Sequence, residues 1–227
     1  MSAGDVCAAA VAGVQVTGAW LSAARDAEAG HLMRVTDEVS ERIAELQLTL
    51  GEGPSLDASA SGGPALASDL ADGESGSHWP TFAPAACQAG AAAVFAFPLA
   101  VGAIQAGVLG LYRDRPGPLS DLQLGDALTF ADIATLLLLD AQDRAARAGP
   151  GADPGGQSAG PASRRAEIDQ ATGMLTEQLG VSITDAFARL RAYAYVNDLR
   201  LADVARDIVA RRLRLSPDPD LPLGDET

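Results

Sequence analysis

The sequence predicts an α+β chain of two domains, in which an antiparallel sheet flanked by helices precedes an all-α bundle of three helices. Three observations predict this organisation. Residues 1–147 alternate β-forming runs, helical segments and turn residues; residues 148–162 are rich in Gly, Pro and Ser; and residues 163–215 carry apolar residues at helical spacing. We therefore expect a first domain at 1–147, a flexible linker at 148–162, a helical domain at 163–215 and a disordered acidic tail at 216–227.

The first elements form a predicted hairpin and a helix. β-forming residues at 14–23 and 31–36 flank a charged, turn-prone segment, which is typical of paired strands. Asp37 is expected to cap a helix that runs to about Leu50. The glycines and proline of "GEGPS" at 51–55 are expected to end that helix.

A second hairpin is predicted in the middle of the chain. After a short strand within 62–70, a loop through "DGESGSHWP" and a helix around Phe82–Gln88, the runs at 92–101 and 104–112 meet at a tight turn. Their continuous apolar character predicts burial on both faces, and their small residues suit either a ligand cavity or tight packing. Pro98 has no N–H group for a ladder, so we expect a bulge or an edge position there.

A long helix closes the first domain. Ser120 and Gln123 have the spacing of a capping box, and the helix is expected to run to about Arg147. Its second half is apolar nearly all round, so we expect it to pack on the sheet with one side and on a partner subunit with the other. This predicts a homodimer.

The second domain reads as three short amphipathic helices. The first covers about 163–179, with Ser163 as its candidate N-cap and Gly180 as the left-handed residue after its end. "SITD" at 182–185 is a capping box for the second helix. The predicted inward residues are Ile168, Ala171, Leu175 and Leu179, then Phe187, Leu190 and Ala194, then Leu201, Val204, Ala205, Ile208, Val209 and Leu213.

Charge divides the chain unevenly. All 16 basic residues are arginine and the net charge is −14. Residues 1–150 carry 7 Arg and 18 acidic residues, whereas residues 161–215 carry 9 Arg and 7 acidic residues. Only the C-terminal domain is therefore suited to a polyanionic partner.

Several classes of function are not expected. Cys7 and Cys87 lie far apart, outside any zinc or redox spacing, and no nucleophile, phosphate-binding or metalloprotease motif is present, so we expect neither a metal site nor an enzyme. A signal peptide requires a basic residue near its start, but no basic residue precedes Arg25, so we expect a cytoplasmic protein. The uncharged stretch Ser75–Tyr112 is interrupted by prolines and glycines, so we expect no membrane span.

The helical domain leaves an outward set of residues with the chemistry of RNA recognition. Small residues allow a backbone or a flat ring to approach closely, arginine pairs with phosphate or guanine, and tyrosine stacks on an unpaired base. An ordinary solvated surface with a glycine at a helix–helix contact is the alternative. The candidate RNA-binding residues are Gln170, Thr172, Gly173, Thr176, Arg191, Tyr195 and Arg200.

The segment "IDQATGMLTEQLGVSITDAFARLRAYAYVNDLRLADVARDIVARR" at 168–212 resembles the ANTAR domain, the RNA-binding module of bacterial transcription antiterminators. The resemblance rests on Gln170, Ala171, Gly173, Met174, Leu175, Gly180, Ala186, Phe187, Leu190, Arg191, Leu201, Val204, Ala205, Ile208 and Val209. It implies an RNA partner with two adjacent small hairpins of six-nucleotide loops, whose binding prevents a terminator hairpin. It also implies a dimer.

Upstream segments resemble the GAF domain that often precedes ANTAR. They include "LQLTLGEGPSLDA", "AVFAFPLAVGAIQAGVLGLYRDRPGPLS" and "DIATLLLLD", and the resemblance covers roughly residues 5–145. It implies a sensor, regulated by an unidentified small-molecule ligand. The helix that often precedes the first GAF strand is expected to be nearly absent, with only Ala3–Val11 available.

Three alternatives stay open from the sequence. A DNA-binding helix-turn-helix would need base-reaching polar residues early in its last helix, which here opens with "LADVARD". A ligand or redox sensor could act through protein partners with a degenerate ANTAR module. An enzyme that reduces methionine sulfoxide, a chemistry known for one GAF group, would need more cysteines than Cys7 and Cys87.

Overall fold

The structure is a computed structural model that describes residues 3–25, 28–102, 104–148, 161–197 and 199–215. The chain divides into two compact units, Met1–Ser163 and Arg164–Thr227. Most of the predicted linker and the whole predicted tail lie outside the described residues, so the predicted domain limits stay predictions.

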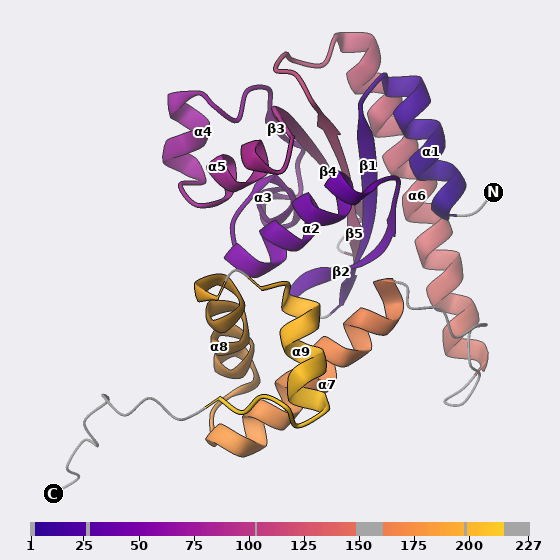
Figure 1. Ribbon diagram of the computed structural model, residues 1–227. Helices are drawn as coiled ribbons and strands as arrows, with labels where there is room; N and C mark the ends of the chain where they lie inside the picture. Colours follow the sequence, from indigo (N-terminus) through magenta and orange to yellow (C-terminus); the bar gives the residue numbers. More distant parts are fainter. Residues whose placement is uncertain (1–2, 26–27, 103, 149–160, 198, 216–227) are drawn as a thin grey trace, which may run out of the picture. The chain divides into compact units, whose positions relative to one another are not determined.

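A five-stranded antiparallel sheet forms the centre of the first unit, with strand order β2-β1-β5-β4-β3 (Figure 1). Both predicted hairpins are present, β1–β2 and β4–β5, and the pairing of β1 with β5 joins them into one sheet. The strands are β1 (Gly18–Arg25), β2 (Glu28–Val35), β3 (Ala65–Ala67), β4 (Ala93–Val101) and β5 (Ile104–Arg113).

Helices cover both faces of this sheet (Figure 1). One face is covered by α1 (Ala3–Val14) and α6 (Asp121–Ala148), and the other by α2 (Glu38–Leu50), α3 (Pro54–Ser61), α4 (Gly73–His78) and α5 (Phe82–Gln88). Alternate residues of β4 therefore enter two cores: Phe95 and Phe97 pack with α1 and α6, whereas Val94 packs beneath α2 and α5. This explains the continuous apolar run that the sequence shows.

The sheet is tightly packed where β5 passes beneath Trp20. The Trp20 side chain is buried, and a Cβ atom added at Gly110 would lie 2.0 Å from its ring. The glycine therefore allows an indole to lie flat on the strand. The small residues of this hairpin allowed either a ligand cavity or tight packing, and the structure shows tight packing at this position.

Pro98 occupies an edge position, as predicted. β3 pairs with β4 only through Val94, Phe95 and Ala96, so Pro98 lies beyond its end, and a bulge follows between Leu99 and Ala100. The missing N–H group of the proline therefore interrupts no ladder.

The helical prediction was incomplete in three places. Pro54 does not extend a loop but opens α3 at its first turn, where a missing N–H group costs nothing. α4 forms inside the expected loop, because the Asp72 side chain accepts a hydrogen bond from the Ser75 backbone N–H at 2.6 Å. The N-terminal helix, expected only over Ala3–Val11, extends to Val14 and packs along α6.

α6 contains one stretch, Asp121–Ala141, that is long and apolar enough to cross a membrane by length and composition. Its Ala127, Ala134 and Leu138 are buried in the core between α1 and the sheet, which is the placement of a core helix. The predicted capping box is present, with Ser120 and Gln123 joined by reciprocal backbone-to-side-chain hydrogen bonds.

The second unit contains α7 (Pro161–Leu179), α8 (Ile183–Val196) and α9 (Leu201–Val209), which confirms the three predicted helices. Ser163 lies inside α7, which begins at Pro161, so its assignment as N-cap was wrong. Gly180 has φ 65° and Ser182 caps α8, as predicted. The predicted inward residues that are buried are Ile168, Ala171, Leu175, Ala186, Leu190, Ala194, Leu201, Val204, Ala205 and Ile208, whereas Leu179, Phe187, Val209 and Leu213 are half-buried.

Candidate nucleic-acid interface

Gly173 lies on the exposed side of α7. A Cβ atom added there meets nothing within 4 Å, so contacts among the described residues do not require a glycine. A glycine inside a helix costs about 1 kcal/mol relative to alanine. Gly173 therefore weakens α7 and leaves open space above its backbone.

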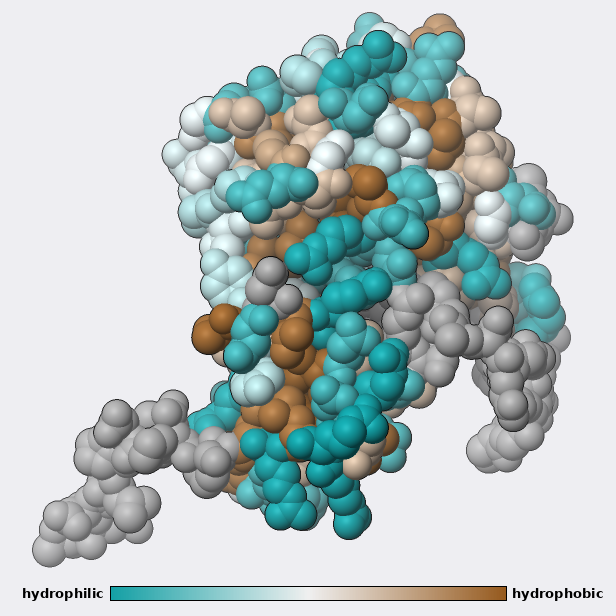
Figure 2. Space-filling model, in the orientation of Figure 1, coloured by the Kyte–Doolittle hydropathy of each residue, from teal (hydrophilic) through white to brown (hydrophobic). Residues whose placement is uncertain are grey.

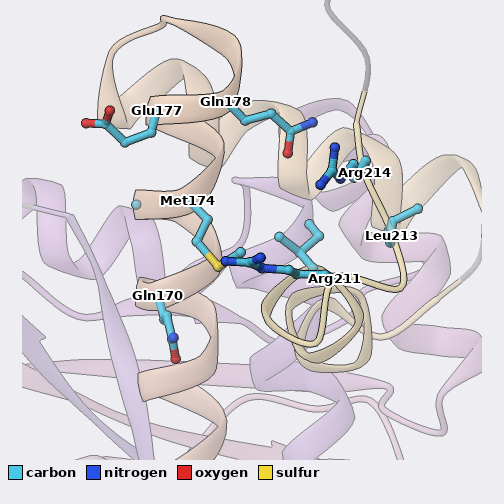
Figure 3. A pocket seen from close by; sticks show the side chains of 9 residues that line it. Gln170, Met174, Glu177, Gln178, Arg211, Leu213 and Arg214 are labelled. Carbon is cyan, nitrogen blue, oxygen red and sulfur yellow. The ribbon is translucent and has the colours of Figure 1, made fainter.

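An open groove of about 670 Å³ lies beside this glycine. Gln170, Gly173 and Met174 of α7 line one side, and Arg211 and Arg214 from the segment after α9 line the other (Figure 3). Figure 3 shows the Arg211 side chain extending across the groove toward Met174. One side of α7 thus faces two guanidinium groups across the groove.

Arg211 has an unusual backbone for its residue type. Its φ is 57°, in the left-handed region, where the turn after a helix normally has glycine. The Arg211 backbone N–H donates to the Ile208 carbonyl at 2.9 Å, and the Arg212 N–H donates to the Asp207 carbonyl at 2.8 Å, so this turn ends α9. A side chain in this conformation costs about 1 kcal/mol. Despite this cost, the turn has an arginine here, and its guanidinium lies beside the groove.

The two groove arginines differ from their neighbours in charge pairing. Arg212 donates to Asp207 Oδ1 at 2.9 and 2.6 Å, and Arg206 pairs with acidic residues of α7 and α9. Among the described residues, neither Arg211 nor Arg214 has a hydrogen-bond or ion-pair partner on its side chain. Glu177 also borders the groove, but its carboxylate points away from both arginines (Figure 3). Both positive charges are therefore available to an anionic ligand.

The candidate RNA-binding residues of α7 do not all lie on its exposed side. Gln170 and Gly173 line the groove, as an outward position requires. The outward assignment of Thr172 was wrong, because its side chain is 5% exposed and its hydroxyl donates to the Ile168 carbonyl at 2.8 Å. Thr176 is half-buried and donates to the Thr172 carbonyl at 3.1 Å. The two threonines therefore bond within their own helix.

The predicted residues of α8 and α9 do not line this groove. The Arg191 guanidinium lies 5.7 Å from the centroid of the Phe187 ring, and burial lowers the pKa of this guanidinium. Tyr195 is 56% exposed, and Arg200 is exposed immediately before α9. Tyr195 and Arg200 thus belong to a separate surface near the α8–α9 connection.

Hydrophobic side chains interrupt the hydrophilic surface near that connection (Figure 2). Val196 is 79% exposed and Leu199 is 46% exposed. A tyrosine, an arginine and exposed apolar groups in this region suit contact with an unstacked base as well as with a protein surface.

Arg211 and Arg214 were absent from the residues that the sequence predicted. The run "ARRLRL" at 210–215 is visible as a basic segment, and Leu213 within it was predicted to continue the apolar face of the third helix, whereas α9 ends at Val209. Only the turn after α9 brings these arginines opposite Gly173, because that turn reverses the chain toward α7.

Comparison with known proteins identifies the second unit. Residues 162–209 match the ANTAR domain family. The match ends before Arg211 and Arg214, so the arginine side of the groove lies beyond it. No curated protein matches the chain.

Solved structures identify the fold of the first unit. The GAF domain of a phosphoenolpyruvate-protein phosphotransferase from Acinetobacter superposes with a TM-score of 0.50 at 12% identity, over 64% of this chain and 87% of that chain. The corresponding GAF domain from Coxiella burnetii gives 0.50 at 16% identity, over 62% and 82%. A domain of a protein described as a two-component sensor histidine kinase from Sinorhizobium meliloti 1021 gives 0.50 at 18% identity, over 64% and 94%.

These likenesses establish the GAF fold of the first unit. The first unit therefore has the GAF fold, and residues 162–209 of the second unit match the ANTAR domain family.

Proposed function

We propose that this chain is a cytoplasmic transcription antiterminator that binds RNA through its C-terminal unit and is regulated through its GAF domain. It holds a paired hairpin RNA with two six-nucleotide loops, and the bound RNA cannot form the overlapping terminator hairpin. The ANTAR match at 162–209 is the observation that carries this proposal. The proposed role is regulatory and involves no catalysis by the chain.

The groove beside α7 supports RNA as the ligand. Gly173 leaves room for a flat base against the helix, and Gln170 offers amide groups that can bond to a base edge. Guanidinium groups bind phosphate oxygens in a bidentate manner, and Arg211 and Arg214 lie on the opposite side of the groove. One strand of an RNA loop thus finds a base contact and a phosphate contact in the same groove.

The second surface extends the proposed interface. Arg191, Tyr195 and Arg200 are proposed to contact RNA from α8 and the start of α9, with the Tyr195 ring stacking on a base. Thr172 and Thr176 support binding only indirectly, because both hydroxyls bond to carbonyls of α7.

A homodimer provides the two RNA-binding units that two adjacent loops require. Leu122, Leu128 and Leu136 of α6 are exposed, at 79%, 42% and 66%. Burial of such leucines against a second copy would remove apolar area from water, which favours association. We propose α6 as the dimer contact, and an unidentified small molecule acting on the GAF domain as the signal.

Transcription in vitro tests the proposed function directly. The template carries two adjacent hairpins with six-nucleotide loops, the second overlapping a terminator, and the full chain is added before elongation. The proposal predicts increased read-through that disappears when one base in each loop is changed. Read-through that is unaffected by the protein, or equally increased on the loop-altered template, would reject it.

A further inference from the structure

A hydrogen bond joins the arginine side of the groove to α7, at the residue where the chain leaves the groove. The Gln178 side-chain amide donates to the Leu215 carbonyl at 2.5 Å, and Leu213 and Arg214 line the groove just before that residue. Residues 216–227 therefore begin at the rim of the groove. Because these residues are covalently attached beside the groove, their side chains can bind there without a separate diffusion step.

The charge of residues 216–227 is opposite to that of the groove. This segment has the acidic residues Asp218, Asp220, Asp225 and Glu226 and no basic residue. Arg211 and Arg214 have no side-chain partner among the described residues, whereas the neighbouring Arg212 is held by Asp207. The groove therefore presents two unneutralised cations to a segment that carries only anions.

The length of chain also fits. Asp218 and Asp220 follow Leu215 by three and five residues, which permits spans of up to about 10 and about 17 Å. Carboxylates attached this close have an effective concentration in the millimolar range at the groove. Weak ion pairs that would not form between separate molecules can therefore form within one chain.

We propose that residues 216–227 bind in this groove when RNA is absent, with their carboxylates on Arg211 and Arg214. RNA phosphates displace them, because both ligands need the same guanidinium groups. The segment thus acts as an internal competitor that weakens binding to arbitrary polyanions more than binding to an RNA that also contacts α8. This inference rests on the proposed function, since it assigns a regulator to the same RNA-binding groove.

The test neutralises the segment in the full chain. One variant carries Asp218→Asn, Asp220→Asn, Asp225→Asn and Glu226→Gln; the matched control changes four acidic residues of the first unit outside α6, Glu38→Gln, Glu45→Gln, Glu74→Gln and Asp114→Asn. The dissociation constant for the tandem-loop RNA is expected to fall about threefold to tenfold in the first variant and less than about twofold in the control. The difference is expected to vanish near 1 M salt, where charge interactions are screened. Equal affinities of the first variant and the unaltered chain would overturn the inference and leave the proposed function intact.

A second measurement needs no RNA. Backbone amide NMR signals of Gly173 and of residues 211–215 are expected to shift between the unaltered chain and the neutralised variant, and unchanged signals would overturn the inference. Shifted signals without RNA binding by any variant would support the internal contact and reject the proposed function. In a chain that also carries Arg211→Gly and Arg214→Gln, neutralising the segment should change neither the signals nor the RNA affinity. A general repulsion between segment and RNA would instead survive in that background.

Discussion

Gly173 and Arg211 line the same groove, and each occupies a backbone position that a different residue would stabilise better. Gly173 lies inside α7, where alanine meets no obstacle, and Arg211 has φ 57°, where glycine is favoured. Natural sequences depart from such local rules mainly at functional sites. Two departures that meet at one groove therefore support the proposal that this groove binds RNA.

Gly173→Ala is expected to stabilise the fold and to weaken RNA binding. Alanine raises the free energy of unfolding by about 0.5–1 kcal/mol, while the added methyl group obstructs a base on α7 and raises the RNA dissociation constant at least about fivefold. Urea unfolding and an RNA titration measure the two effects. Gly125→Ala in α6 is the matched control, since a Cβ atom there also meets nothing within 4 Å, and it should change stability alone. An unchanged RNA affinity in Gly173→Ala would show that the open helix surface is not used.

Arg211→Gly is expected to act in the same two directions. Removing a side chain from the left-handed region raises stability by about 1 kcal/mol, and the lost phosphate contact weakens RNA binding and lowers the slope of log affinity against log salt by about 0.7. The control is Gln15→Gly, because Gln15 is exposed and also has φ 57°. If the slope of log affinity against log salt were the same in Arg211→Gly as in Gln15→Gly and in the unaltered chain, Arg211 would make no phosphate contact.

Asp37 is expected to make the stability of the first unit pH-dependent. Burial alone would raise the pKa of its carboxyl, but hydrogen bonds from the Ser40 backbone and from the Thr36, Ser40 and Tyr112 side chains outweigh burial and hold that pKa below its ordinary value. The carboxylate therefore stabilises the fold above the ordinary pKa of about 4, and this contribution is lost as pH falls through the lowered value.

Asp37→Ala tests this linkage by removing both the cap of α2 and these bonds. It is expected to cost about 2 kcal/mol at pH 7 and progressively less in acid. Urea unfolding at several pH values measures the difference, and a difference independent of pH would contradict the assignment.

The two thiols are expected to react at very different rates. Burial raises the pKa of the Cys7 thiol to about 11, and its side chain is 1% exposed. The pKa of the Cys87 thiol is raised mainly by burial and also by the negative charge of the nearby Asp69, although this thiol is only half-buried. A disulfide reagent at pH 8 should therefore modify Cys87 first and Cys7 only after denaturation, with Cys7→Ser and Cys87→Ser assigning each phase. Rapid reaction of native Cys7 would favour the redox-sensor alternative.

Much of the fold could be predicted from local sequence signals. Asp37, Ser120 with Gln123, Ser182 and Gly180 mark helix ends through their own chemistry, so those ends were predictable. α4 was not predictable, since "GESGSH" has no apolar periodicity and depends on the Asp72 cap and the packing of Trp79.

The candidate site was only partly predictable. Gln170 and Gly173 follow from helical spacing, but Thr172 lies four residues after Ile168 and on the same buried side of α7. Arg211 and Arg214 flank Leu213, which the sequence predicts on the last helix although α9 ends at Val209, so helical spacing did not place these arginines opposite Gly173. The groove exists only because the turn after α9 brings the chain back to α7.

Titration of the full chain with an RNA carrying two adjacent six-nucleotide hairpin loops tests directly whether the protein recognises such loops. The competitors are the same RNA with one base changed in each loop and a duplex DNA of equal length. The proposed function predicts saturable binding that loop changes weaken by at least about tenfold, roughly 1.4 kcal/mol, and that the DNA does not reproduce. Equal affinity for all three nucleic acids, or no binding to any of them, would contradict it.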